Sequence, residues 1–530
     1  MNIPAFLYFF NLLWASPSIV FTRGLDSHKT APFRVESLPG ISSLPPSWAG
    51  RLPVPGAKKG NDIFFWLFES ENLVHDDNLI IWFNGGPGCS SLIGLATGNG
   101  PFSFDGNSTN LVRNPHSWTQ LGNVLYVDQP VGTGLSTASV PYPVRDNGQV
   151  TTDFAAWLIG FFEQFPHMQS KQIHLMGESY AGIYIPYITS QLLQSNSSVP
   201  FNIASISLGD GSWGNGAAMS SVATGRYLRS QSSLLGIPED ILSVFAEADE
   251  SCGFNEVLAK SAIYPPREKF DIPGNPEYFN LKRRRRDLTN ALNAACDIGP
   301  TTPEEVRTSI FNSTCYGPCA TFSTAMDYMT TKSANSSTRG CYDVYDISHD
   351  CTSISALPLL AEYFSRADVQ KALHVHDSGP YSACNSTILA TLLAAESPVP
   401  PEYFLLPSLI TQHNISLHLY SGQWDMLINH LGAELSLQNM TWRGAQGFSK
   451  PPSRLFYADD AAPHKTKMPK PAHTSALSAA SASMKAAGIW AEERGVSYHL
   501  FREAGHSVFI NKPREMFSYV RDVVVSAKSD

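Results

Sequence analysis

Residues 172–193 read QIHLMGESYAGIYIPYITSQLL. An apolar run with a β-branched residue passes into a turn of small residues, and the turn leads directly into a segment that can form a helix. Gly177 and Ala181 allow a strand to turn sharply into a helix, which leaves Ser179 strained and exposed at the helix N-terminus. The pattern predicts a nucleophile elbow, with Ala181 in place of the second glycine of GxSxG. A bare match of this kind also fits an ordinary glycine-flanked turn, so the context must decide between the two.

The same rhythm of short apolar runs, glycine-rich turns and helical stretches covers much of the chain. Helical stretches separate several of the runs, as at residues 153–163. Strands that alternate with helices are typical of an α/β fold with a mostly parallel sheet. The predicted buried strands are residues 79–83, 123–127, 172–176, 204–208, 416–420 and 496–501.

The composition is that of a globular protein with a large core. Of the 530 residues, 43% are hydrophobic and only 16% are charged, which excludes a disordered chain and a coiled coil. The net charge of −9 gives a nucleic-acid partner no electrostatic help, so we expect no such partner. We also expect no stable membrane anchor, because no apolar segment is long enough to span a bilayer.

The alternation of predicted strands and helices stops between residues 211 and 353. Six of the eight cysteines fall within one hundred residues of this segment. An even, clustered set predicts disulfides that staple one subdomain. A zinc site is the weaker alternative, because Cys315 and Cys319 have ligand spacing but nothing nearby completes a tetrahedral set. We therefore expect a helical, disulfide-stapled lid at residues 211–353, inserted into a core of residues 31–210 and 354–525. The clustered cysteines are Cys252, Cys296, Cys315, Cys319, Cys341 and Cys351.

A run of five basic residues, Lys282 to Arg286, lies within this insertion. It fits either a solvated face or a site of proprotein processing. Five charges without interleaved aromatic residues form no nucleic-acid groove, so the run does not change the expectation about partners.

The first residues of the chain resemble a secretory signal, expected at residues 1–22. Residues 3–15 are almost wholly apolar and small residues follow, although no lysine or arginine precedes them. A buried N-terminal helix is the alternative. Seven N-x-[ST] sequons agree with the secretory pathway and predict N-linked glycans. The sequons start at Asn107, Asn196, Asn312, Asn335, Asn385, Asn414 and Asn439.

Two loops beyond predicted strands carry partners for Ser179. In hydrolases with a nucleophile elbow, the order along the chain is serine, acid, histidine. Asp425 follows the strand at 416–420, and His506 follows the strand at 496–501. Each residue alone also fits an ordinary role, as a turn-capping aspartate or a surface histidine. Because loops at one edge of a parallel sheet converge, the three residues together predict a catalytic triad.

The loop after the strand at 79–83 reads NGGPGCSS over residues 84–91. Its glycines let the main chain approach a carbonyl group, and we expect the N–H groups of Gly86 and Tyr180 to bind the developing oxyanion. A phosphate-binding loop is the competing interpretation. It is disfavoured because GxxxxGK[ST] is absent and no lysine follows.

These motifs, in this order, resemble the serine carboxypeptidases from about residue 31 to 525. The resemblance implies an α/β-hydrolase core with a helical insertion. It also implies release of single residues from the C-termini of peptides or proteins, usually at acidic pH in a vacuole or outside the cell. We expect no cofactor and no metal. The motifs are NGGPGCSS at 84–91, DQPVGTG at 128–134, GESYAG at 177–182, Asp425 with Asn429, and Gly505-His506.

The resemblance also assigns roles to single residues. Ser179 is cast as nucleophile, His506 as base and Asp425 as the residue that orients it. The terminal carboxylate of the substrate would be bound by Asn84, Gly85 and Glu178, and a disulfide would join Cys89 to Cys384.

The chain departs from the family at Gly98, where a glutamate normally pairs with the one before the serine. Two carboxyl groups that share a proton have one raised pKa, and the protonated pair can donate a hydrogen bond to a carboxylate. Without that partner, we expect Glu178 to lose its proton at lower pH and then to repel a terminal carboxylate. Gly98→Glu is expected to restore selectivity if its side chain fits. Ser507 replaces a methionine and Ile428 a cysteine, changes expected to alter the shape of the pocket and not its chemistry.

Three classes of function follow from these observations. The first is a serine carboxypeptidase, which the sequence favours. The second is an acyltransferase or esterase of the same fold, which needs no site for a free carboxylate. A non-enzymatic binding scaffold is the third, and the complete triad argues against it.

Overall fold

The computed structural model describes residues 27–194, 201–273, 299–312, 316–331, 341–351, 356–377, 379–395, 399–458 and 486–526. The predicted signal segment, the basic run at 282–286, two sequons (Asn196 and Asn335) and Cys296 and Cys315 lie outside the described residues. Predictions about them are not tested by the structure.

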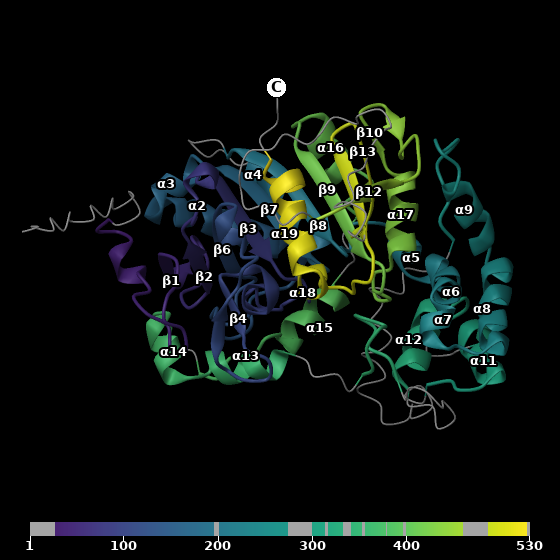
Figure 1. Ribbon diagram of the computed structural model, residues 1–530, viewed down its shortest axis with the longest axis horizontal. Helices are drawn as coiled ribbons and strands as arrows, with labels where there is room; N and C mark the ends of the chain where they lie inside the picture. Colours follow the sequence, from purple (N-terminus) through teal and green to yellow (C-terminus); the bar gives the residue numbers. More distant parts are fainter. Residues whose placement is uncertain are drawn as a thin grey trace, which may run out of the picture.

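A ten-stranded sheet runs through the centre of the molecule in the order β1-β2-β6-β3-β7-β8-β9-β14-β13-β12 (Figure 1). The run from β6 to β14 is parallel, and antiparallel strands extend it at both edges. The sheet is therefore mostly parallel, as predicted. Its strands are β1 (Ser47–Pro53), β2 (Asp62–Phe68), β3 (Asn78–Phe83), β6 (Asn123–Asp128), β7 (Gln172–Glu178), β8 (Ile203–Gly209), β9 (Ser416–Gly422), β12 (Arg454–Phe456), β13 (Gly488–Glu493) and β14 (Val496–Phe501).

All six predicted strands are confirmed, and they are the six parallel strands of the centre. The four antiparallel edge strands were not predicted. β12 has only three residues, and β1, with sequence SWAGRLP, has no β-branched residue and ends in proline, so both lack the usual signals of a strand. β2 did carry a signal in its run IFFWLF.

Helices cover both faces of the sheet. Neighbouring residues of β3 are buried on opposite faces, Phe83 in one apolar cluster and Trp82 in the other, as expected for a strand covered on both sides. The Phe83 cluster includes residues of α2, α4 and α16, and the Trp82 cluster includes residues of α13 and α19. The helices of these layers and their connections are α1 (Leu92–Gly94), α2 (Asn147–Gln164), α3 (Pro166–Gln169), α4 (Ala181–Gln194), α13 (Leu357–Phe364), α14 (Ala367–Ala372), α15 (Ser386–Ala394), α16 (Leu405–Thr411), α17 (His430–Asn439), α18 (Val508–Asn511) and α19 (Pro513–Tyr519).

The inserted segment forms a separate group of helices beside the sheet (Figure 1). Helices α6, α7, α8, α11 and α12 share an apolar cluster that also contains Met426, the residue after Asp425, and residues of α5 and α9 lie in a second cluster. Disulfides Cys252–Cys319 and Cys341–Cys351 staple the insertion, as predicted. The boundaries at residues 211 and 353 stay a prediction. The helices of this region are α5 (Gly216–Met219), α6 (Ser221–Ser230), α7 (Ser232–Leu235), α8 (Glu239–Ser251), α9 (Phe254–Ser261), α11 (Pro303–Asn312) and α12 (Thr321–Thr330).

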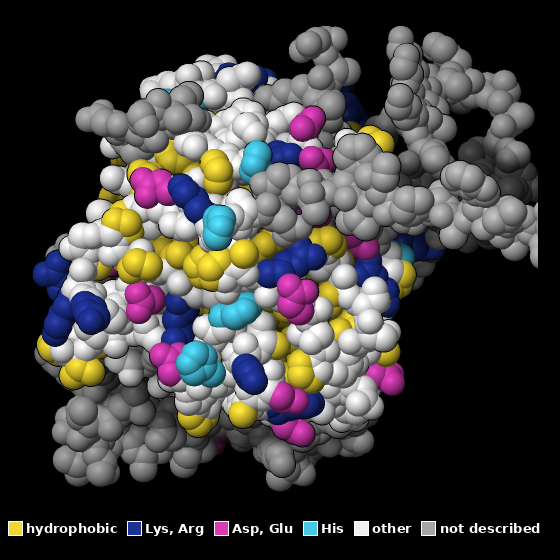
Figure 2. Space-filling view, turned by 90° about the vertical axis from the view of Figure 1, so that its left-hand side faces the viewer, with side chains coloured by type: hydrophobic (Ala, Val, Ile, Leu, Met, Phe, Trp, Pro, Cys, Tyr) yellow, Lys and Arg dark blue, Asp and Glu magenta, His cyan; other side chains and the backbone are white. Residues whose placement is uncertain are grey.

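Charged side chains of both signs are interspersed on the face shown in Figure 2. Within the described part of that face, lysine and arginine form no continuous basic surface. Among the described helices, none combines the length and the apolar character that crossing a membrane requires.

Candidate active site

The nucleophile elbow has the geometry that its sequence predicts. β7 ends at Glu178 and α4 begins at Ala181, and Ser179 between them has φ 62°. A Cβ atom on Gly177 would lie 2.6 Å from the Cβ of Ala181, so the turn needs small residues at both positions. A non-glycine residue at positive φ is strained, and such strain concentrates at functional sites.

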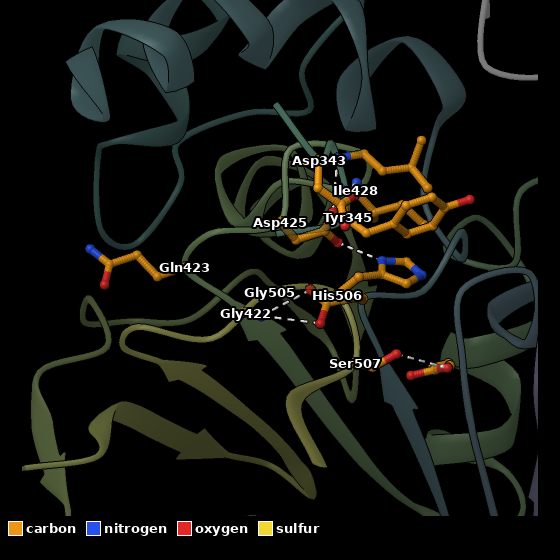
Figure 3. A network of polar contacts seen from close by, with 12 residues as sticks. Asp343, Tyr345, Gly422, Gln423, Asp425, Ile428, Gly505, His506 and Ser507 are labelled. Carbon is orange, nitrogen blue, oxygen red and sulfur yellow. Dashed lines mark hydrogen bonds and ion pairs between the residues drawn. The ribbon is translucent and has the colours of Figure 1, made fainter. Parts of the chain in front are cut away.

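Asp425 and His506 meet at the carboxyl ends of their strands, close to the elbow. The Nδ1 atom of His506 lies 2.7 Å from the Oδ2 atom of Asp425, and both side chains are buried (Figure 3). The other oxygen of Asp425 accepts hydrogen bonds from the backbone N–H groups of Leu427 and Ile428. The aspartate is thus held from both sides, and its pairing with Nδ1 leaves Nε2 of the imidazole for chemistry.

The pKa of His506 reflects two opposing effects. Burial by itself lowers the pKa, but the charge and hydrogen bond of Asp425 and the charge of Glu178 outweigh it, so the net pKa is raised. An imidazole with a raised pKa is a stronger base, and its neutral form becomes available as a general base as the pH rises toward that pKa.

The insertion contributes Tyr345 to this site, which the sequence did not predict. Its ring lies 5.2 Å from the His506 ring, edge to face, and its carbonyl accepts a hydrogen bond of 2.7 Å from the His506 N–H. The N–H groups of Met426 and Leu427 donate to the carbonyl of Val344. The end of the insertion is therefore fixed against the loops that carry Asp425 and His506.

Asp210 is a second unpredicted residue of the site. It follows β8 with φ 39°, and both its carboxyl oxygens accept from the N–H of Gly422 at 2.9 and 3.1 Å. Burial and then the charge of the neighbouring Asp425 raise the pKa of Asp210 well above the usual range. An aspartate directly after a predicted strand was the available signal.

The glycine loop after β3 approaches the elbow closely. A Cβ atom on Gly85 would lie 2.4 Å from the backbone nitrogen of Tyr180, so only glycine fits there, and Gly86 has φ 109°. The carboxyl group of Asp128 anchors the loop by accepting hydrogen bonds from Ser90 Oγ and the Ser91 N–H. This arrangement brings the backbones of residues 85–86 and 179–180 together.

The predicted Cys89–Cys384 disulfide is present. Two backbone hydrogen bonds flank it, from the Ser90 N–H to the Ala383 carbonyl at 2.7 Å and from the Asn385 N–H to the Gly88 carbonyl at 2.9 Å. The disulfide thus fastens the glycine loop to a segment that lies 295 residues away in the sequence.

Asn84 and Glu178 are in contact beside the elbow. The amide oxygen of Asn84 accepts from Trp82 Nε1 at 2.8 Å and from the Gly94 N–H at 3.0 Å. These two donors fix the orientation of the amide, so its Nδ2 group points to Glu178 and donates to Oε1 at 2.7 Å. Ser507 Oγ donates to the same Oε1 at 3.2 Å (Figure 3). Ser507 thus changes the chemistry of the pocket, and the expectation that it alters only the shape is wrong.

Glu178 retains its proton without a second carboxyl group. Burial raises its pKa to about 7, although the charge of His506 and the hydrogen bonds from Ser507 and Asn84 act in the opposite direction. The expectation that Glu178 loses its proton at lower pH than a paired glutamate stays a prediction. The raised pKa is caused by desolvation, which sequence motifs do not reveal.

The space beside Gly98 is occupied. A Cβ atom at this position would lie 2.6 Å from Cδ2 of Phe509 and 2.8 Å from its carbonyl oxygen. Phe509 is itself buried and packs edge to face on Trp82 at 5.4 Å. A glutamate at position 98 does not fit, so the expectation that Gly98→Glu restores selectivity is not supported.

The described residues hold no group of three or more His, Cys, Asp or Glu side chains arranged to bind a metal ion. The groups that the structure gathers at this site are the buried His506–Asp425 pair, the half-buried Ser179 in its strained turn, and the buried Glu178.

Known proteins resemble this chain over almost its whole length. A family model described as serine carboxypeptidase matches residues 45–526. A carboxypeptidase Y homolog from Arthroderma benhamiae is 42% identical over 99% of this chain and 100% of its own. A pheromone-processing carboxypeptidase, KEX1, from Verticillium alfalfae is 29% identical over 96% of this chain and 70% of its own. The crystal structure of a prohormone-processing carboxypeptidase, Kex1, from Saccharomyces cerevisiae matches with a TM-score of 0.67 at 20% identity, covering 93% of this chain and 96% of the other.

Proposed function

Since the chain belongs to the serine carboxypeptidase family, we propose that Ser179, His506 and Asp425 are the residues that carry out its serine-type hydrolysis. The observation that carries this proposal is the buried His506–Asp425 pair, with a 2.7 Å hydrogen bond, beside a serine in a strained elbow. The acyltransferase or esterase alternative is not favoured, because the relatives over the full length are carboxypeptidases.

The proposed reaction has two acyl-transfer steps. Ser179 Oγ attacks the carbonyl carbon of the last peptide bond while His506 takes the hydroxyl proton, and Asp425 stabilises the imidazolium that forms. The N–H groups of Gly86 and Tyr180 stabilise the oxyanion. The peptide bond then breaks, His506 gives its proton to the leaving amine, and the peptide remains as an ester of Ser179. Water, deprotonated by His506, hydrolyses that ester.

Recognition of the free C-terminus is assigned to Asn84, Gly85 and Glu178. The Oε2 atom of Glu178 is buried and has no hydrogen-bond partner among the described residues. Because burial holds the pKa of this carboxyl group near 7, Glu178 is protonated at acidic pH and its Oε2–H group can donate to a terminal carboxylate. Asn84 Nδ2 lies alongside as a second donor, and Gly85 is assigned to the same subsite because its lack of a side chain lets the glycine loop pack against Tyr180.

We assign the protein to the secretory pathway, as a secreted or vacuolar enzyme. The apolar N-terminal stretch and the three disulfides of the described residues support an oxidising compartment. Asn107, Asn312 and Asn414 are exposed and suited to carry N-linked glycans. Asn439 is buried and hydrogen bonds to both the N–H and the carbonyl of Phe270, so a glycan at this sequon does not fit the fold.

The test compares three substrates of the same sequence: a blocked dipeptide with a free C-terminus, its C-terminal amide, and the matching ester. A carboxypeptidase cleaves the free acid with the highest kcat/KM at pH 5. Equal rates on acid and amide, or cleavage of the ester alone, would contradict the assignment. Loss of all three activities in Ser179→Ala shows that they share one nucleophile.

A further inference from the structure

The corner beside Glu178 is filled by the segment that follows His506. The resemblance described above implies a second glutamate at position 98, where this chain has glycine. Phe509, three residues after His506, fills the space in front of Gly98, and a Cβ there would lie 2.6 Å from its ring. The segment after His506 thus occupies the corner that a larger side chain at position 98 would need.

The hydrogen bonds of Glu178 are distributed unequally between its two oxygens. Oε1 accepts from Asn84 Nδ2 at 2.7 Å and from Ser507 Oγ at 3.2 Å, whereas Oε2 is buried with no partner in the described part of the chain. A carboxyl oxygen that already accepts two hydrogen bonds is a poor site for the proton. The proton therefore resides on Oε2, where it forms a donor.

We propose that Ser507 is a positioning residue for exopeptidase specificity: its hydroxyl occupies Oε1 of Glu178 and so directs the single proton of Glu178, through Oε2, at the terminal carboxylate of the substrate. This inference rests on the proposed function. It deepens that function by naming what replaces the second carboxyl group.

The other titratable groups near Glu178 leave this role to Ser507. Burial raises the pKa values of Tyr345 and Tyr420, and burial with the charge of Asp425 raises that of Asp210, so all three are neutral below pH 7. His506 and Asp425 shift the pKa of Glu178 in opposite directions, and these two residues are paired with each other.

The test is Ser507→Ala, assayed with the free-acid dipeptide and its amide at several pH values. Losing one hydrogen bond worth roughly 1 kcal/mol is expected to raise KM for the acid about fivefold. The kcat for the acid and both constants for the amide should change less than about twofold. Because the Ser507 hydrogen bond lowers the pKa of Glu178, its removal should also move the fall-off of acid cleavage to higher pH.

Two further variants distinguish a positioning role of the Ser507 hydroxyl from a role in packing. Ser507→Thr keeps the hydroxyl and should restore the KM of the acid. Ser518→Ala removes a buried hydroxyl that has no partner in the described structure and lies in α19, away from the site, and it should change neither substrate.

The outcomes are distinguishable. A wild type that prefers the acid, together with Ser507→Ala enzyme that keeps the same preference and the same pH fall-off, overturns the role of Ser507 alone. Equal losses on acid and amide, without rescue by threonine, also overturn it and indicate a structural role. A wild type with no preference for the acid overturns the proposed carboxylate recognition itself.

Discussion

Two parts of the active site, the Asp425–His506 pair and the Asn84–Glu178 pair, each contain a buried carboxyl group, but the two carboxyl groups are bonded differently. Both oxygens of Asp425 have partners, two backbone N–H groups on one and His506 on the other. In Glu178 only Oε1 accepts hydrogen bonds, from Asn84 and Ser507, and desolvation raises the pKa of the group to about 7 against them. Similar burial thus leaves one carboxyl group fully bonded and the other with a buried oxygen that is open to a ligand.

The two pairs also differ in what surrounds them. Beside Glu178, Phe509 fills the space next to Gly98, and Ser507 donates a hydrogen bond to Glu178 Oε1. The predictions below test whether the two parts are as separable as this comparison implies.

The largest effect is expected for Ser179→Ala. Turnover of acid, amide and ester substrates should fall on the order of a millionfold, because loss of the nucleophile stops acyl transfer for all of them. The melting temperature should stay close to that of the wild type, since the Ser179 side chain is small and only half-buried. Initial rates with active-site-titrated enzyme check this, and retained ester hydrolysis would show that another nucleophile serves the site.

Loss of the Cys89–Cys384 disulfide, which fastens the glycine loop, is expected to destabilise the fold that holds both parts of the site. Replacing Cys89 and Cys384 together by serine should lower the free energy of unfolding by roughly 2–5 kcal/mol, because a loop of 295 residues is no longer closed. Denaturant unfolding measures the change. The same replacement at Cys341 and Cys351, only 10 residues apart, is the matched control and should cost less. Equal losses for the two pairs would contradict this explanation.

Glu402 tests whether burial alone raises a carboxyl pKa in this fold. It is buried away from the triad, and burial raises its pKa to about 7. A carboxyl group whose pKa is raised stabilises the fold fully below its unfolded pKa of about 4.5, and loses that contribution as the pH rises through 7. Relative to Glu402→Gln, the wild type should lose up to about 3 kcal/mol between pH 4.5 and 8. Unfolding curves over this range that stay parallel would contradict the desolvation argument.

The smallest effect is expected for Gly98→Ala. The added methyl group collides with Phe509 and should destabilise the protein by about 1–3 kcal/mol. It should also raise KM for the free acid more than for the amide, because Phe509 lies two residues after Ser507, which donates to Glu178. Gly160→Ala, where the new Cβ meets only Pro55 at 3.6 Å, is the control and should not destabilise. Thermal melting and steady-state kinetics check both variants.

The sequence predicted the parts of the site that depend on local order. The elbow around Ser179 follows from small residues between a strand and a helix, and Asp425 and His506 follow from their places after predicted strands. The convergence of these loops is a property of any parallel sheet. For the same reason the six central strands were recognised from their apolar runs.

The residues that the sequence did not reveal depend on contacts between distant loops. The hydrogen bond from Ser507 to Glu178 joins positions 329 residues apart, so the departure at Ser507 did not reveal which group its hydroxyl contacts. The carboxyl group of Asp210 reaches Asp425 from a different strand. The pKa of Glu178 depends on how completely the surrounding loops exclude water, which a single sequence does not show.

The central claim is that one buried, protonated glutamate recognises the free C-terminus. The most direct measurement is the ratio of kcat/KM for the acid to that for the amide between pH 4 and 9, because the shared dependence on His506 cancels in this ratio. For the wild type the ratio should be high at pH 5 and fall as the pH passes through about 7, where Glu178 loses its proton. In Glu178→Gln, whose amide donates at every pH, the ratio should stay level. A wild-type ratio that falls already near pH 4.5, or a Glu178→Gln ratio that falls like that of the wild type, would contradict the account.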